Sequence, residues 1–181
     1  MAASVTQVWK KVTPELEAEL VQFWTSNNAI GAETDAAKRA KQVVCIARDE
    51  GGKLVGASTA HPRIVPRLRQ PMYYYRNFIA EGARGQQLAP EFLEQSKQAL
   101  QKYNLGLSKP LCLGIIIELE NKGLAAHRNE AQWKEGFTFI GYSPKGLTLR
   151  VWYFEGVKLF APARLKKQAG GPRPRQAAAG A

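Results

Sequence analysis

The stretch MYYYRNFIAEGARGQQLAPEFLEQSKQALQKY, residues Met72 to Tyr103, decides the fold of this chain. Its pattern predicts an aromatic strand over 72–80, a turn of small residues over 81–89 and an amphipathic helix over 90–103. A turn that opens a helix can bind an anion, because the first helical N–H groups lack partners and the helix dipole favours negative charge there. We therefore expect a loop that binds a pyrophosphate; an ordinary strand-to-helix connection is the alternative.

Individual residues of this turn suit an anion site. Arg84 would place a fixed cation beside the ligand. Gly82, Gly85 and Ala89 carry little or no side chain, so the backbone could approach a phosphate closely.

The composition is that of a globular protein. The chain has 181 residues, of which 45% are hydrophobic, enough for one domain with a substantial core. No apolar run reaches the ~18 residues that would span a membrane, and the first residues lack the pattern of a signal peptide. The two cysteines, Cys45 and Cys112, stand in apolar strand-like runs and are expected in the core, which suits a reducing, cytoplasmic location.

The formal net charge of +11 is unevenly distributed along the chain. Residues 156–181 contain six basic residues and no acidic one, so +5 remains for the first 155 residues. This moderately basic body suits an anionic cofactor or an acidic partner. The Ala, Gly, Pro, Arg and Lys-rich end predicts a folded domain over 1–158 and a disordered basic tail over 159–181. Such a tail could bind nucleic acid non-specifically or simply keep the protein soluble.

Hydrophobic periodicity predicts the remaining elements. Strands are expected at 7–12, 43–48, 54–65, 111–117, 137–142 and 147–154, and further helices from Pro14 to the polar run 26–28, at 33–41 and at 125–134. Pro62 and Pro66 are expected to end the strand over 54–65 or to force a bulge in it. Antiparallel hairpins thus flank a strand–helix–strand unit, which predicts a mixed α/β domain.

Four motifs in this order resemble the GNAT superfamily of acyl-CoA-dependent N-acyltransferases. They are the hairpin VVCIARDEGGKLVGASTA (43–60), the central strand leading into ARGQQLA (83–89), the strand LCLGIII followed by ELEN (111–121) and the segment AQWKEGFTFIGY (131–142). Together they cover about residues 5 to 155. The resemblance implies an α/β fold with a mixed, mostly antiparallel central sheet of about seven strands, helices on both faces, and a fourth strand that splays from the fifth.

The resemblance further implies that acetyl-CoA, or another acyl-CoA, binds in the gap between these two strands. The pantetheine would pair with the backbone of Asn77, Phe78 and Ile79 as an added strand does. The pyrophosphate would be held by Arg84 and by the amides of the turn, which are those of Gly85, Gln86, Gln87, Leu88 and Ala89. Arg84 and Ala89 match the family's phosphate motif, whereas Gln87 stands where the motif has its central glycine.

The chemistry that the resemblance implies is direct attack of a neutral amine acceptor on the thioester, with a base that removes a proton from the amine. Glu118 and Glu120 follow the fifth strand one residue apart, so their side chains should share a face, and each is a candidate base. Glu81, at the end of the central strand, is a third candidate. Solvated acids and a surface ion pair are the alternatives for these residues. Gln132 stands where the family often has a tyrosine that protonates the thiolate.

The aromatic strand should present its tyrosines to both faces of the sheet. Tyr73 and Tyr75 share one face and Tyr74 the other, so at least one is expected in the core and another could line the acceptor pocket. The two histidines, His61 and His127, leave little scope for a metal site, and none is expected.

Two other functions remain open at the level of sequence. One is a nucleic-acid-binding or nucleic-acid-modifying protein on the same fold, suggested by the tail, the tyrosines and the basic connection that contains Arg63, Arg67 and Arg69. The other is a non-catalytic interaction module, suggested by the departures at Gln87 and Gln132. A homodimer is compatible with each of these functions.

Overall fold

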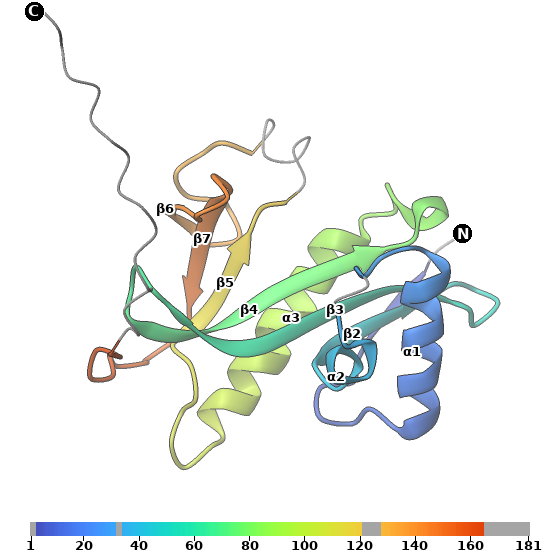
Figure 1. Cartoon of the computed structure of the whole chain (residues 1–181), viewed down its shortest axis with the longest axis horizontal. Helices are drawn as coiled ribbons and strands as arrows, with labels where there is room; N and C mark the ends of the chain where they lie inside the picture. The colour runs from blue at the N-terminus through green and yellow to red at the C-terminus, as the bar shows by residue number, and fades with distance from the viewer. Residues whose placement is uncertain (1–2, 32–33, 121–127, 165–181) are drawn as a thin grey trace, which may run out of the picture.

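The computed structural model describes residues 3–31, 34–120 and 128–164. Its elements, in chain order, are β1 (Ser4–Gln7), α1 (Pro14–Ser26), α2 (Ala36–Ala40), β2 (Val43–Arg48), β3 (Leu54–Val65), β4 (Gln70–Ile79), the 3-10 turn η1 (Glu81–Ala83), α3 (Leu88–Leu105), β5 (Gly114–Glu118), β6 (Thr138–Tyr142) and β7 (Thr148–Tyr153) (Figure 1). None of the helices in these described ranges is long and apolar enough to cross a membrane.

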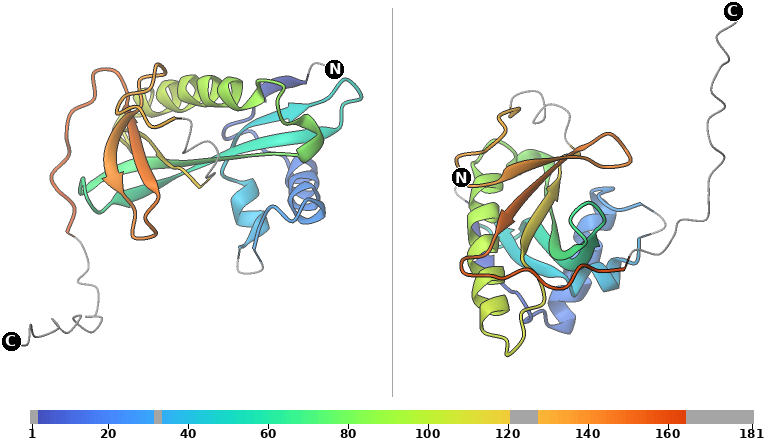
Figure 2. Two further views of the ribbon diagram at one scale, coloured as in Figure 1. Left: turned by 90° about the horizontal axis from the view of Figure 1, so that it is seen from above. Right: turned by 90° about the vertical axis from the view of Figure 1, so that its left-hand side faces the viewer.

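The seven strands form one sheet in the order β1-β2-β3-β4-β5-β7-β6. Neighbouring strands are antiparallel except β4 and β5, which are parallel. Helix α3 covers one face of the sheet, here called the α3 face, and α1 and α2 cover the other, the α1 face (Figure 2). The predicted fold class, a mixed and mostly antiparallel sheet with helices on both faces, is therefore confirmed.

Both faces of the sheet carry a core. On the α3 face, Tyr73 and Tyr75 of β4 are buried in one cluster with Phe92 of α3. On the α1 face, Leu20 and Trp24 of α1 are fully buried over β2 and β3. Helix α1 can begin where it does because the Thr13 hydroxyl caps it and Pro14 occupies its first turn.

The alternation predicted for the three tyrosines is confirmed. Tyr74 lies in a cluster that includes neither Tyr73 nor Tyr75, among Met72 and Ile116 of the α1 face. Both cysteines are buried and unpaired, as the sequence predicted.

The parallel pair β4 and β5 separates part-way along. Their register joins Tyr73 to Ile115, Tyr74 to Ile116 and Tyr75 to Ile117, and no further pairing follows among the described residues. Strand β4 nevertheless continues to Ile79 beside β3, while β5 follows β7 to Glu118. The predicted splay is thus present, and Figure 1 shows β5 and β7 turning away from the far half of β4.

Strand β3 has the predicted bounds and is more regular at Pro62 than expected. It runs through Pro62, which pairs with Tyr73 without a bulge, and ends just before Pro66. Ala60 donates its N–H to the carbonyl of Gln42, so alternate residues of β3 direct their backbone groups toward β2. Strand β2 begins opposite Thr59, so the missing N–H of Pro62 would point past the end of β2 and its absence removes no hydrogen bond.

The predicted first strand, at 7–12, was wrong. The strand occupies Ser4–Gln7, and the chain then turns, with Lys10 at φ 61° and the Lys11 N–H bonded to the Val8 carbonyl. Val8 and Val12 pack against the cluster on the α1 face from this irregular segment, so their spacing reflects burial rather than a strand.

The helix predicted at 125–134 is also wrong over the described residues of that range, 128–134. Residues 125–127 lie outside the described residues, and 128–134 form no helix. Instead Trp133 N–H bonds to the Phe137 carbonyl, and Phe139 N–H bonds to the Ala131 carbonyl. The segment turns back on itself and joins the edge of β6.

The chain beyond β7 returns to the hairpin between β3 and β4. Gln70, only 6% exposed, exchanges two hydrogen bonds with the backbone of Phe160, at 2.9 and 3.0 Å. Ala163 N–H bonds to the Arg69 carbonyl, and Phe160 packs against the cluster around Tyr74. The domain boundary at 158 stays a prediction, but residues 160–163 are attached to the folded body, and residues from 165 onward lie outside the described residues.

Candidate functional site

The turn between β4 and α3 has the backbone shape of an anion site. Beyond η1, Gly85 has φ 84° and Gln87 has φ 59°, and α3 begins at Leu88. Within the described residues, the backbone N–H groups from Gly85 to Ala89 donate no hydrogen bond, and no side chain caps the helix. Consecutive free donors at the start of an 18-residue helix suit a negatively charged ligand.

Gln87 keeps the backbone conformation that the glycine of the motif would adopt. Its φ of 59° and ψ of 13° lie in the left-handed region, which glycine enters without strain. The side chain is exposed.

Arg84 lies beside this turn on the protein surface. Its Nε donates a hydrogen bond to the Ile79 carbonyl at 3.3 Å, so the guanidinium group lies near the end of β4. In the described part of the chain its terminal N–H groups have no partner, and they can donate to a phosphate.

The edge of β4 that faces the gap offers two of the three predicted backbone positions. On this edge, the Pro71 carbonyl accepts the Leu113 N–H at 3.0 Å. Because alternate residues of a strand direct their backbone groups to opposite neighbours, Asn77 and Ile79 also face the β5 side. Phe78 faces β3, where it pairs with Ala57. The structure therefore makes Asn77 and the N–H of Ile79 available to a ligand strand, while the Ile79 carbonyl accepts from Arg84 Nε and Phe78 is not available.

Glu118 and Glu120 both contact β4 where the two strands separate. Tyr74 donates its hydroxyl hydrogen to Glu118 Oε2 at 2.5 Å. Arg76 Nη2 donates to the Tyr74 hydroxyl at 3.1 Å and to Glu120 Oε1 at 2.7 Å. The four side chains form one connected network on the α1 face, at the inner end of the gap.

The pKa of the Glu118 carboxyl lies below its ordinary value. Burial acts to raise this pKa, but hydrogen bonds from Ser143 and Tyr74 and the charges of Lys145 and Arg63 outweigh it. The pKa of the Tyr74 phenol is raised, first by burial and then by its hydrogen bond to Glu118. At neutral pH the pair is therefore a carboxylate and a neutral phenol.

A pocket of about 320 Å³ adjoins this network on the α1 face. Its lining comes from the start of α2 and from β3 and β4, and consists of Thr34, Asp35, Lys38, Arg39, Gln42, Thr59, His61, Tyr74 and Arg76. Tyr74 thus links the pocket to Glu118. Sequence reasoning missed Tyr74 and Arg76 as partners of the glutamates, although the parallel alignment of the two strands could have suggested them.

The structure does not bring Glu81 to this network. It is exposed in η1, beyond the end of β4. Ile79 lies five positions beyond Tyr74, which is about 17 Å along an extended strand. Glu81 lies instead beside the turn that holds Arg84.

Comparison with known proteins supports the same architecture. No family model matches the sequence, and a comparison with curated proteins finds no match. Solved structures do match, among them a GNAT-family acetyltransferase from Streptococcus pneumoniae at 16% identity, with a TM-score of 0.51 over 82% of this chain and 96% of the other. A GNAT superfamily phosphinothricin acetyltransferase from Sinorhizobium meliloti, in complex with AcCoA, matches at 14% identity, with a TM-score of 0.54 over 90% and 96%.

This chain has the GNAT fold. A mutant of the toxin AtaT, bound to the C-terminus of the antitoxin AtaR and acetyl-CoA, shares it at 12% identity, with a TM-score of 0.53 over 84% of this chain and 94% of the other. Proteins with the GNAT fold thus include acetyltransferases and at least one toxin.

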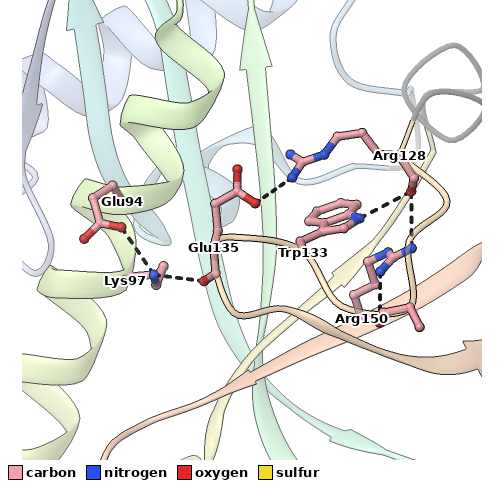
Figure 3. Close-up of polar contacts among 7 residues, drawn as sticks. Glu94, Lys97, Arg128, Trp133, Glu135 and Arg150 are labelled. Carbon is pink, nitrogen blue, oxygen red and sulfur yellow. Dashed lines mark hydrogen bonds and ion pairs between the residues drawn. The ribbon is translucent and has the colours of Figure 1, made fainter.

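The segment before β6 departs from the helix that resemblance to GNAT proteins predicted. Trp133 lies between two guanidinium groups, with Arg128 at 4.0 Å and Arg150 at 4.4 Å from its ring centroid (Figure 3). Arg128 also pairs with Glu135, and Arg150, 2% exposed, donates to the Arg128 carbonyl at 3.2 Å. These contacts hold the segment on β7 without a helix.

Gln132 is exposed in this same segment and forms an isolated bridge with Thr138. It occupies no helix from which the side chain of an acid could project into the gap.

Proposed function

We propose that this protein transfers an acyl group, most simply acetyl, from acyl-CoA to an amine. One observation carries the proposal: β4 separates from β5 and then leads into a turn whose five amides, at 85–89, donate no hydrogen bond within the described part of the chain. The pantetheine would run along the gap and pair with Asn77 and Ile79, and the pyrophosphate would bind the amides of 85–89. The phosphinothricin acetyltransferase that shares the fold was solved with AcCoA.

The reaction is direct transfer. The amine nitrogen attacks the carbonyl carbon of the thioester, so that a C–N bond forms and the C–S bond breaks. The proton lost by the amine passes to a base, and the leaving thiolate takes up a proton and departs as the free thiol of CoA. Chemistry therefore requires an ionised base at the inner end of the gap.

Glu118 fits the role of this base better than the other two candidates. It lies at the point where the strands separate, and it accepts a hydrogen bond from Tyr74, which lines the pocket. Glu120 is held in an ion pair with Arg76, and Glu81 lies at the far end of β4. Tyr74 orients the carboxylate, and His61 is a second possible base because it lines the same pocket.

Calorimetry with acetyl-CoA on the full chain tests the cofactor site. We expect micromolar binding by the wild type and at least ~10-fold weaker binding by Arg84→Glu, because the new carboxylate would repel the pyrophosphate. Lys109→Glu changes the net charge equally at an exposed residue beyond α3 and is the matched control.

Two results would contradict the proposal. If the wild type fails to bind millimolar acetyl-CoA, the fold serves another purpose in this protein. If Arg84→Glu binds with full affinity while Lys109→Glu does too, the pyrophosphate lies elsewhere.

A further inference from the structure

The pocket beside Tyr74 is rich in cationic side chains. Lys38 and Arg39 reach it from α2, and Arg76 reaches it from β4. Arg63 borders it, since it follows His61 by two residues on the same face of β3 and its guanidinium lies 5.1 Å from the Tyr74 ring centroid. Cations from three separate elements therefore surround a small cavity.

Most of these cations lack an acidic partner. Across the described ranges, ion pairs include Arg76 with Glu120 but none to Lys38, Arg39 or Arg63. The one carboxylate that lines the pocket, Asp35, accepts the backbone N–H of Lys38 at 2.9 Å. Asp35 and Glu120 therefore offset only part of the positive charge of the four cations at the pocket.

Two of the arginines are also oriented and partly desolvated. The guanidinium of Arg39 lies 5.2 Å from the Trp24 ring centroid, which holds it at the wall of the pocket. Arg76 has a buried Nε with no hydrogen-bond partner among the described residues. A buried donor without an acceptor is destabilising, and an anionic ligand could supply that acceptor.

The same cations affect the pKa of His61. Its pKa is lowered by burial and then by the charges of Arg63, Arg76, Lys38 and Arg39. The charged and titratable groups around it are these four cations, the Asp35 carboxylate that lines the same pocket, and the neutral phenol of Tyr74, whose ring centroid lies 5.6 Å away. An anion bound here would offset the cations and raise the pKa of His61 again.

We propose that the acceptor is a small amine that carries an anionic group, a phosphate or a carboxylate, and that this group binds among Arg39, Arg63 and Arg76. The proposal rests on the proposed acyl transfer and names its substrate class. A volume of about 320 Å³ suits a small molecule or the end of a larger one. With its anion among the arginines, the acceptor directs its amine toward Tyr74 and Glu118, where the C–N bond forms and the proton leaves.

An NMR titration tests the anion site without any acyl transfer. The chain contains only two histidines, so the His61 signal can be assigned by comparison with His61→Gln. Inorganic phosphate and acetate are the probes, added to the full chain. We expect the pKa of His61 to rise with phosphate or acetate, and the effect to be lost in Arg39→Gln and in Arg63→Gln. Lys53→Gln, in the exposed turn between β2 and β3, is the control and should keep it.

Competition among acceptors tests the substrate class. Phosphoethanolamine, β-alanine, ethanolamine and ethylenediamine provide a phosphate, a carboxylate, a neutral and a cationic arm with similar amines. We expect kcat/KM to be at least ~10-fold higher for one of the two anionic amines than for ethanolamine, because a charge-assisted hydrogen bond of ordinary strength is worth that much. Arg39→Gln and Arg63→Gln should reduce this ratio. The anionic amine with the higher kcat/KM shows whether the site prefers a phosphate or a carboxylate.

Failure of this inference is distinguishable from failure of acyl transfer. If kcat/KM for ethanolamine or ethylenediamine equals or exceeds that for the anionic amines, and the pKa of His61 does not shift with phosphate or acetate, the acceptor is not anionic. Acyl transfer itself would be left intact by that result. Binding of an oligonucleotide that needs Arg39 and Arg63, without any effect of the small anions, would overturn it in favour of a nucleic acid. Circular dichroism of each variant identifies loss of folding, and Arg63, which is exposed, provides the variant least able to perturb the core.

Discussion

Gln87 is the residue at which the turn before α3 departs from its motif and yet keeps its shape. An ordinary L-residue in the left-handed region is strained by about 1 kcal/mol relative to glycine. No side-chain hydrogen bond caps the helix here to offset that strain. The strain is therefore retained beside the proposed pyrophosphate site, which suggests that the backbone conformation matters more than the side chain.

Replacing Gln87 by glycine should tighten acetyl-CoA binding. We expect a several-fold lower Kd, because the turn keeps its conformation and the ligand no longer has to displace an exposed side chain. Stability should change by less than about 1 kcal/mol, since relief of the strain is offset by the greater freedom of glycine in the unfolded chain. Calorimetry and thermal melting measure the two effects. Asn28→Gly, at φ 49° in an exposed turn, is the matched control, and weaker binding by Gln87→Gly alone would show that the side chain contacts the ligand.

Glu118→Gln should separate chemistry from binding. The amide can still accept the hydrogen bond from Tyr74 but cannot take a proton, so kcat should fall by about 10²-fold or more while the Kd of acetyl-CoA stays the same. Steady-state kinetics with the best acceptor, together with calorimetry, measure both quantities. Glu120→Gln should have a smaller effect on kcat, and the reverse order would assign the base to Glu120.

The pH profile gives an independent check on the same residue. Because the pKa of Glu118 lies below its ordinary 4.5, the carboxylate stays ionised as pH falls from neutrality, and its protonation should limit kcat/KM only below about pH 4.5. Above that range the profile should follow deprotonation of the acceptor amine. Because the pKa of His61 lies below its ordinary 6.5, a wild-type limb on the acid side of pH 6.5 that disappears in His61→Gln would assign the base to His61 instead.

At the scale of elements, the join between β5 and β7 depends on a close backbone approach at Gly114. A Cβ at this position would lie 2.8 Å from the Tyr153 Cα and still closer to the Trp152 carbonyl oxygen. Gly114→Ala should therefore push the two strands apart and lower the free energy of unfolding by about 3 kcal/mol. Urea denaturation measures the change. Gly82→Ala, where a Cβ would meet nothing within 4 Å, should be nearly neutral, and equal effects of the two substitutions would contradict the assigned register.

Most elements could be predicted because each carries its own local signal. The hairpin of β2 and β3 follows from two apolar runs around Asp49 to Gly52, and the start of α3 follows from Pro90, which only a first turn tolerates. The first strand and the segment at 128–134 could not be predicted, because distant contacts determine them. Val8 packs half-buried against the cluster on the α1 face, and Trp133 is held by Arg150 of β7.

Part of the candidate site could likewise be predicted from the sequence, and part of it could not. The turn from Arg84 to Ala89 is contiguous, so its sequence alone indicates an anion site. Glu118 was a candidate from its place at a strand end, whereas its partner Tyr74 depends on the pairing of strands 40 or more residues apart. The pocket cations from α2 depend on how that short helix packs over β3 and β4, which periodicity does not encode.

At the scale of the whole molecule, the chain beyond β7 contributes to the stability of the sheet. A fragment that ends at residue 157 should have a free energy of unfolding about 2–4 kcal/mol lower than that of a fragment that ends at residue 164. The truncation removes Phe160 from the cluster around Tyr74 and leaves the buried amide of Gln70 without its two hydrogen bonds. Urea denaturation of the two fragments measures this difference. Equal stability would mean that Phe160 rests on the surface without contributing energy.

The cytoplasmic location, a homodimer and nucleic-acid binding by the tail stay predictions.

The regular passage of β3 through Pro62 affects how copies of this protein meet one another in concentrated solution. Beyond Thr59 one edge of β3 has no neighbouring strand among the described residues, and Ile64 is 40% exposed on that stretch. Such an edge can recruit a strand from another copy and begin aggregation. A proline there withholds a donor that an incoming strand would need, so Pro62 protects the solubility of a long strand at no loss to its own pairing.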